Sequence, residues 1–414
     1  MTIFHLLAGI ATLAAVFAWI NYRFIKLPMT IGVMILALVG SALIVVSGRL
    51  GLIPVVELEK FIGAIDFEET LLNGMLGALL FAGALHVNLE RLIAKRGLIL
   101  SLATVSLLLS TALVAICGFF VFSFAGLAIP FGWMLLFGAL IAPTDPIAVA
   151  GILRRVGVPA DLEATIAGES LFNDGVGVVL FVILLELLSG GTVTAGGVAR
   201  LVATEVVGGL AYGAVIGWVV YRMLRAVDQH QVEILLTLAL VTGGYALAHI
   251  LHVSGPLAMV VAGLIIGNRG RRDAMSEMTR VRLDQFWELV DEFLNAVLFV
   301  LIGLEVVVLE ITPQTVLAAA LAIPLVLLAR YVSVALSVEV LKSGRELPGG
   351  SVAILTWSGL RGGISVALAL SLPAGGNRPA LIAITYGVVC FSIIVQGLTV
   401  GPLTSRLLAR KQSS

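Results

Sequence analysis

The chain has 414 residues, of which 60% are hydrophobic and only 12% charged, and its mean hydropathy is +1.12. Since roughly a quarter of the residues in an average soluble domain are charged, this composition excludes an ordinary soluble protein. Lysine plus arginine equals aspartate plus glutamate at 25 each, so net charge indicates neither nucleic acid nor an acidic partner. The sequence therefore predicts a protein surrounded by membrane lipid.

Apolar runs follow one another along the whole chain, and most are long enough to cross about 30 Å of hydrocarbon as a helix. We expect an all-α polytopic membrane protein of about thirteen transmembrane helices, with residues 1–414 forming one transmembrane domain. The predicted spans are 4–22, 28–48, 68–88, 98–124, 130–154, 162–189, 199–225, 232–252, 255–268, 285–309, 314–341, 350–371 and 380–408. The ninth span is short, so we expect it to be tilted, broken or joined to its neighbour.

Lysine and arginine between the spans predict the orientation, because they collect in cytoplasmic loops. With the N-terminus outside, the inner loops hold most of these residues, and the outer loops hold Arg49, Lys60, Arg200 and Arg378. We therefore predict a multi-pass protein of a bacterial-type inner membrane, with its N-terminus outside and its C-terminus in the cytoplasm.

Two predicted spans contain helix-breaking residues near their middles. In the fifth span Pro143 and Pro146 bracket Thr144 and Asp145, and in the twelfth span two glycines follow Arg361. Because proline removes a backbone donor and glycine loosens a helix, both spans should be partly unwound. Interrupted spans at corresponding places in two halves indicate a transporter's midplane site. The predicted units are inverted six-helix repeats at about 1–189 and 232–408, joined by a linker helix at about 199–225.

Two carboxylates are predicted to meet near the membrane centre. At the helical rise, Asp145 lies roughly 14 Å from Arg154 in an inner loop, and Asp174 lies roughly 18 Å into the sixth span from the same side. An ionisable residue at such depth indicates function, because a charge in hydrocarbon is costly. Helical spacing places Ser170 on the same face as Asp174. With the unwound backbone at Thr144, these groups offer hard oxygen ligands, which suit an alkali cation.

The hydroxyl groups of Thr144 and Ser170 have two interpretations of equal weight. Each can ligate the ion, or each can form a hydrogen bond within its own helix. The sequence contains neither a histidine cluster nor a Cys-x-x-Cys pattern that would indicate another metal site.

Three further charged residues in predicted spans need partners, since an uncompensated charge at such depth is costly. They are Glu169, Arg330 and Arg361. We expect Glu169 to pair with Arg330. Arg361 is expected to offset the negative ends of the broken helices where the two interrupted spans cross.

Four motifs lie in order along the chain: APTDP at 142–146, GESLFNDG at 168–175, LFVLIGLE at 298–305 and GLRGGIS at 359–365. Together they resemble the NhaP and NHE branch of the sodium/proton antiporters. The resemblance implies an NhaA-like antiporter fold with crossed, interrupted helices. It also implies a homodimer in which a core bundle moves against a dimerisation bundle.

The same resemblance assigns roles to residues of this chain. It implies that Asp174 is the essential carboxylate and that Ser170, Asp145 and Thr144 surround the ion. In the family, an asparagine before the essential aspartate, here Asn173, accompanies electroneutral exchange. The resemblance further implies the ion pair between Glu169 and Arg330, and one departure is Ala82, which stands where some members carry an additional acid.

The predicted function follows from competition, because a carboxylate held away from water can hold a proton or a cation but not both well. We predict a secondary transporter that exchanges Na+ or Li+ for H+ by alternating access, with no cofactor beyond the transported ions. An intramembrane enzyme is the alternative from another class, but the sequence lacks Gly-x-Ser-x-Gly, His-Glu-x-x-His and Gly-x-Gly-Asp motifs. A K+/H+ antiporter and a cation channel on the same scaffold are closer alternatives.

Overall fold

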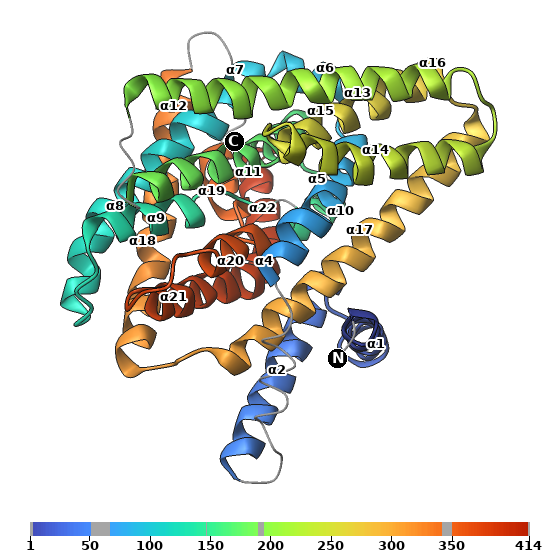
Figure 1. The fold of residues 1–414 in the computed structure, drawn as a ribbon. Helices are drawn as coiled ribbons and strands as arrows, with labels where there is room; N and C mark the ends of the chain where they lie inside the picture. The colour runs from blue at the N-terminus through green and yellow to red at the C-terminus, as the bar shows by residue number, and fades with distance from the viewer. Residues whose placement is uncertain (1–2, 51–66, 146, 189–193, 342–349, 413–414) are drawn as a thin grey trace.

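The computed structural model describes residues 3–50, 67–145, 147–188, 194–341 and 350–412, which are predominantly helical (Figure 1). Within these ranges the extended pairing is one isolated bridge between Asp145 and Leu360, so the predicted all-α class is confirmed. Pro146 and Lys60, which entered the predictions of the fifth span and of the orientation, lie outside the described residues.

The first half of the chain forms helices whose bounds follow the predicted spans closely. Several are continuous across one π-helical turn, labelled η. They are α1 Ile3–Ile20, η1 Asn21–Ile25, α2 Met29–Arg49, α4 Phe67–Glu69, η2 Thr70–Met75, α5 Leu76–Leu85, α6 Leu89–Ala94, α7 Arg96–Ser101, η3 Leu102–Ser106, α8 Leu107–Phe124, α9 Phe131–Ile141, α10 Ile147–Val156 and α11 Ala160–Leu188.

The second half continues in the same manner, with η6 as a single 3-10 turn. Its elements are α12 Ala195–Val202, η4 Ala203–Val207, α13 Gly208–Leu224, α14 His230–Ile250, α15 Gly255–Ile265, η5 Ile266–Gly270, α16 Arg271–Asp273, α17 Glu277–Glu305, η6 Val306–Val308, α18 Pro313–Val340, α19 Ser351–Ser358, α20 Gly363–Leu370, α21 Arg378–Phe391, η7 Ser392–Gln396 and α22 Gly397–Gln412.

Eight helical segments in the described ranges are long and apolar enough to cross a bilayer. They are Leu7–Ile25, Met29–Gly48, Arg96–Phe124, Ala160–Leu188, Gly196–Leu224, His230–Ile250, Pro313–Val340 and Arg378–Ala409. Large apolar side chains such as Phe120, Val215 and Leu328 are exposed on their outer faces. Such faces suit lipid rather than water. The count of thirteen spans and the inverted repeat remain predictions.

The two predicted interruptions are confirmed. In the fifth span α9 ends at Ile141 and the unwound residues 142–145 follow it before α10, and the twelfth span is divided into α19 and α20 by residues 359–362. The two unwound segments lie against each other, because the Asp145 backbone N–H donates to the Leu360 carbonyl at 2.7 Å. This contact is the crossing point of the interrupted spans.

The ninth predicted span is longer than expected, which corrects its boundary. Helix α15 continues through η5 and α16 to Asp273, beyond the polar residue Asn268. The Asn268 side chain accepts from the Leu89 N–H at 2.9 Å and donates to the Val87 carbonyl at 3.0 Å. The sequence marks Asn268 as the end of the span because it is polar, whereas in the fold it joins two helix ends.

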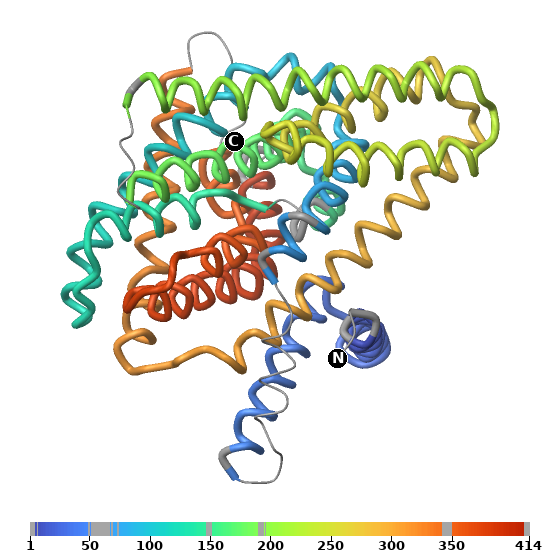
Figure 2. The backbone as a smooth tube through the Cα atoms, in the orientation of Figure 1, coloured from blue at the N-terminus to red at the C-terminus, as the bar shows by residue number. Residues whose placement is uncertain are grey.

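Helix α11 packs against α7, α9 and α15. The long helix α17 crosses the molecule obliquely in Figures 1 and 2 and packs against α2, α5 and α14. Helix α18 packs against α8, α19 and α21, so it lies close to one of the interrupted spans.

Helices α13 and α15 pack with their backbones in close approach, which generates a stability prediction. A Cβ atom at Gly213 would lie 2.4 Å from the Ala258 backbone oxygen, so Gly213→Ala must push the helices apart. We expect a loss of about 1–3 kcal/mol, measured by thermal unfolding in detergent. The control is Gly243→Ala on α14, where a Cβ atom meets nothing within 4 Å. Equal melting temperatures for both variants would contradict this packing.

Candidate cation site

The unwound segment between α9 and α10 is held to α11 through the polar groups of Thr144. The Asn173 side chain accepts from the Thr144 N–H at 3.3 Å and donates to the Thr144 hydroxyl at 2.8 Å. One turn earlier on α11, the Ser170 hydroxyl donates to the Thr144 carbonyl. The Ser170 hydroxyl thus bonds the unwound segment, and the predicted ligand residues Thr144 and Ser170 lie in direct contact.

Both predicted aspartates lie beside this contact. Asp174 follows Asn173 on α11 and is 6% exposed. Asp145 follows Thr144 and precedes α10, and its carboxylate lies against Gly362, where a Cβ atom would come within 2.3 Å of Asp145 Oδ2. Glycine at this position is therefore what lets the Asp145 carboxylate approach the start of α20.

Arg361 neutralises the end of α9 from the other interrupted span. Its guanidinium Nη1 donates to the carbonyls of Ala142 and Pro143, the latter at 2.9 Å. Both carbonyls lie just past the C-terminal end of α9, where the helix dipole is negative. The Arg361 side chain is 2% exposed, so its charge faces these carbonyls away from solvent. This is the location that the sequence predicts for it.

Arg330 on α18 bridges α11 and α19. Its Nη1 forms an ion pair with the Glu169 carboxylate, and its Nη2 donates to the Leu355 carbonyl at 3.2 Å. The two side chains are 5% and 2% exposed. Leu355 lies in the last turn of α19, so Arg330 faces the negative end of that helix as well. The predicted pairing of Glu169 with Arg330 is thus present in the structure.

The charges at the crossing form a complementary pattern. The C-terminal ends of α9 and α19, which are negative, face Arg361 and Arg330. The N-terminal ends of α10 and α20, which are positive, lie beside Asp145. Helix dipoles favour opposite charges at their ends. The crossing can therefore hold several charged side chains without water around each of them.

Two polar residues that the sequence predictions did not single out support the twelfth span. The Ser392 hydroxyl accepts from the Arg361 backbone N–H at 2.9 Å and donates to the Gln396 side chain at 2.7 Å. The Gln396 amide in turn donates to the Trp357 carbonyl at 3.2 Å. The available signal was a glutamine within an apolar run, since buried polar groups require partners.

The predicted departure at Ala82 lies in α5, which packs against α11. Ala82 is buried, and the neighbouring Gly83 faces Leu171 of α11. The backbone oxygen of Ala82 lies 3.0 Å from Nδ1 of His86, one turn along α5. This position therefore adds no carboxylate to the cluster of Asp145 and Asp174.

Comparison with known proteins identifies the family. The family described as "Sodium/hydrogen exchanger, transmembrane" matches residues 11–406, which is nearly the whole chain. The chain belongs to the sodium/hydrogen exchanger family. The resemblance predicted from the four motifs is confirmed, and the members of this family are transporters rather than enzymes in the usual sense.

Two antiporters match this chain over more than nine tenths of their own length. The Na+/H+ antiporter NhaP of Pseudomonas aeruginosa is 50% identical over 410 residues, covering 98% of this chain and 97% of the relative. The Na+/H+ antiporter NhaH of Halobacillus dabanensis is 34% identical over 375 residues, covering 88% and 91%. Among solved structures, the sodium proton antiporter MjNhaP1 from Methanocaldococcus jannaschii matches with a TM-score of 0.74 and 21% identity, covering 98% of each chain. This sodium/hydrogen exchanger family member is therefore a multi-pass membrane protein with the MjNhaP1 fold.

The buried ion pair yields a second prediction. Glu169→Ala and Arg330→Ala should each cost about 3–5 kcal/mol of stability, because either change leaves one buried charge without its partner. The double variant should lose less than the sum of the two, as measured by thermal unfolding in detergent.

A matched control is the exposed pair of Arg154 and Glu163, whose Nε and Oε1 atoms are 2.6 Å apart. Arg154→Ala should cost at most about 1 kcal/mol. If both buried single variants are as stable as the parent and merely shift the apparent Na+ affinity, the pair has no structural role.

Proposed function

We propose that this family member exchanges Na+, or Li+, for H+ by competition of the cation and the proton for the Asp174 carboxylate. Asp174, Ser170, Asp145 and Thr144 are the proposed ligands of the transported cation. The site alternates between access from the cytoplasm and access from the outside. A bacterial-type inner membrane, an N-terminus on the outer side and a homodimeric assembly are parts of the same proposal.

The observation that supports this proposal is the set of hydrogen bonds by which Ser170 and Asn173 of α11 hold the unwound segment at Thr144. Ser170 and Asn173 both bond Thr144, and Asp145 and Asp174 are the next residues in sequence to Thr144 and Asn173. Hydroxyl, carbonyl and carboxylate oxygens are the donors that alkali cations prefer. The four residues come from two elements that meet at the crossing, so a relative movement of those elements would alter the site.

Competition supplies the coupling between the two ions. Binding of Na+ to Asp174 requires the ionised carboxylate, and protonation of the same group expels the cation. The empty, ionised site would leave an uncompensated charge while it moves across the membrane, which is costly. Exchange is therefore favoured over the independent leak of either ion.

Asp145 is proposed to stay ionised throughout the cycle. Its carboxylate lies beside Gly362 at the start of α20, and α10 begins two residues after it. The positive ends of two helices favour the ionised form. Asn173, the neighbour of Asp174, carries no charge, and Ala82 adds none from α5. One carboxylate then alternates between Na+ and H+, so exchange is electroneutral.

Sodium is the preferred substrate over the alternative of potassium. The relatives reported above are named as Na+/H+ antiporters, which supports Na+ for this chain. Exchange of Na+, Li+ and K+ for protons in reconstituted vesicles that contain a pH-sensitive dye separates these substrates directly.

Asp174→Asn is the first test of this proposal. Because asparagine cannot alternate between an ionised and a protonated form, we expect at least about a tenfold loss of Na+-driven proton movement in vesicles. The control is Asp161→Asn near the start of the same helix, where the carboxylate contacts Arg91 and Lys95 in an exposed cluster. If a folded Asp174→Asn protein retains more than about a tenth of wild-type exchange, the assignment of Asp174 is refuted.

Voltage tests the one-for-one coupling. With the membrane potential clamped by K+ and valinomycin, the steady-state Na+ gradient should depend on the pH gradient alone. We expect no shift when the imposed potential changes. A ratio of the Na+ gradient to the pH gradient that changes with the imposed voltage would contradict electroneutral exchange. It would indicate Asp145 as a second proton carrier.

A further inference from the structure

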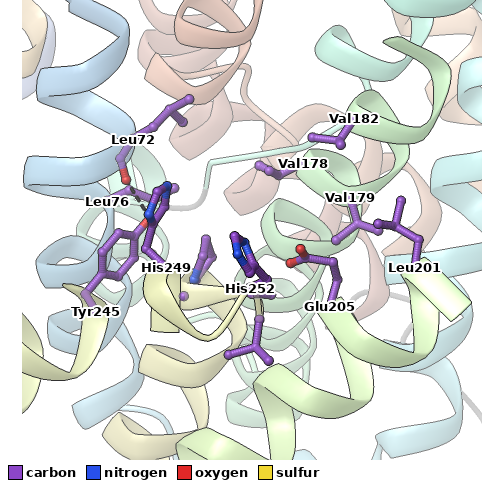
Figure 3. A pocket seen from close by; sticks show the side chains of 14 residues that line it. Leu72, Leu76, Val178, Val179, Val182, Leu201, Glu205, Tyr245, His249 and His252 are labelled. Atoms are coloured by element: carbon purple, nitrogen blue, oxygen red, sulfur yellow. Dashed lines mark hydrogen bonds between the residues drawn. The ribbon is translucent and has the colours of Figure 1, made fainter. Parts of the chain in front are cut away.

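A cavity of about 300 Å³, away from the crossing, is lined by residues of η2, α5, α11, α12, η4 and α14 and of the loop that leads into α15 (Figure 3). Its apolar wall includes Leu76, Val178, Val182 and Leu201. The cavity lies on the far side of Asp174 from the basic loop residues, since Arg154 pairs with Glu163 near the start of α11. In the predicted orientation, the cavity therefore faces the outer side of the membrane.

The inner end of this cavity comes within one helical turn of the cation site. Val178, in the cavity wall, follows Asp174 by four residues on α11, so both lie on one face. Between them, Leu257 of α15 packs against Gly175, where a Cβ atom would lie 2.6 Å from the leucine side chain. Leu257 follows the lining residue Pro256, so this apolar contact lies near the inner end of the cavity and beside the residue next to Asp174.

The cavity contains a compact set of titratable side chains that the proposed exchange site does not use. They are Glu205 of η4, Tyr245 and His249 of α14, and His252 of the following loop. Figure 3 shows Glu205 and His252 directed toward each other across the cavity.

The backbone holds these groups in place. Glu205 lies in a π-helical turn, and its carbonyl accepts from the Ser254 N–H at 3.1 Å. π-Helical turns are frequent at functional sites. His252, which lines the cavity, has a φ of 53°, a left-handed conformation that is uncommon for residues other than glycine.

Other charged groups adjoin the cavity from the elements that pack around it. Glu69 lies three residues before the lining residue Leu72, and Glu186 lies one turn beyond Val182 on α11. Arg200 precedes Leu201 on α12. None of these three lines the cavity itself, so Glu205 and the two histidines set most of its internal charge.

We propose that this cavity is the outer vestibule of the exchange site and that protonation of His249 and His252 weakens its attraction for cations. The inference rests on the proposed exchange at Asp174. With both histidines neutral, Glu205 gives the vestibule a negative charge that draws Na+ toward the contact of Leu257 with Gly175. Histidine changes its charge between about pH 5 and pH 8, so acidic outer solution makes the vestibule positive. Rebinding of exported Na+ is then suppressed.

The test measures the apparent KM for Na+ on each side of the membrane separately. In right-side-out vesicles with fixed internal pH, the apparent KM for external Na+ should rise as external pH falls from about 8 to about 6. The double variant His249→Gln/His252→Asn should reduce that rise by about tenfold, since asparagine also tolerates the left-handed backbone at position 252. Proton competition at Asp174 accounts for the rise that remains.

Two single variants test the sign of the charge. Glu205→Gln should raise the apparent KM at about pH 8 by about fourfold, the effect of one unit charge at roughly 10 Å in a partly hydrated site. His249→Lys, which adds a permanent charge, should raise it by a similar factor. In inverted vesicles, where the solution contacts the cytoplasmic side, the same variants should leave the KM for Na+ unchanged.

His230→Gln is the matched control, because His230 lies at the other end of α14. It should behave as the wild type in both kinds of vesicle. The proposed role of the vestibule is contradicted if the double histidine variant keeps the wild-type dependence on external pH. It is also contradicted if Glu205→Gln leaves the KM for external Na+ unchanged. Loss of exchange in the wild-type protein itself would instead contradict the proposed function.

Discussion

Two helices stop inside the membrane, and every backbone group that they release must be satisfied within the protein. Hydrocarbon offers no hydrogen bonds, so an unwound segment survives only where protein or enclosed water supplies partners. Here Asn173 and Ser170 bond Thr144 in the fifth span, while Ser392 and Arg361 bond the freed groups at the crossing. Each interrupted span is therefore stabilised by side chains from other helices rather than by its own ladder.

The same constraint creates the chemistry of the site. Broken helices expose four dipole ends, and the arginines at the two negative ends leave the positive ends available to Asp145. Glu169 then balances Arg330, which leaves Asp174 on α11 as the carboxylate next to Asn173 and Thr144. A transported cation would complete the charge balance of this cluster. A proton on Asp174 would complete it equally well, which is why one group can serve both ions.

The sequence predicts those features of the site that carry a free-energy cost in a membrane, namely broken helices and buried charges. Prolines and glycines within apolar spans identify the interruptions, and buried charges identify Asp174, Glu169 and Arg330, because such residues are tolerated only with partners. The hydrogen-bond partners of buried groups are harder to predict. Nothing in the sequence distinguishes Ser392 and Gln396 from other polar residues, although Ser392 bonds both Arg361 and Gln396 in the structure. The extension of α15 past Asn268 was missed for a related reason: the polarity of a residue does not reveal whether its partner is water or another helix end.

Competition of Na+ and H+ for Asp174 is the central claim, and calorimetry of Na+ binding to the purified protein tests it most directly. Titration of NaCl in two buffers with different ionisation enthalpies gives the number of protons released for each Na+ bound. The account predicts release approaching one proton for each Na+ at pH values where Asp174 is protonated, and no release from Asp174→Asn. Saturable Na+ binding with the same heat in both buffers would show that no proton leaves, and would contradict the account.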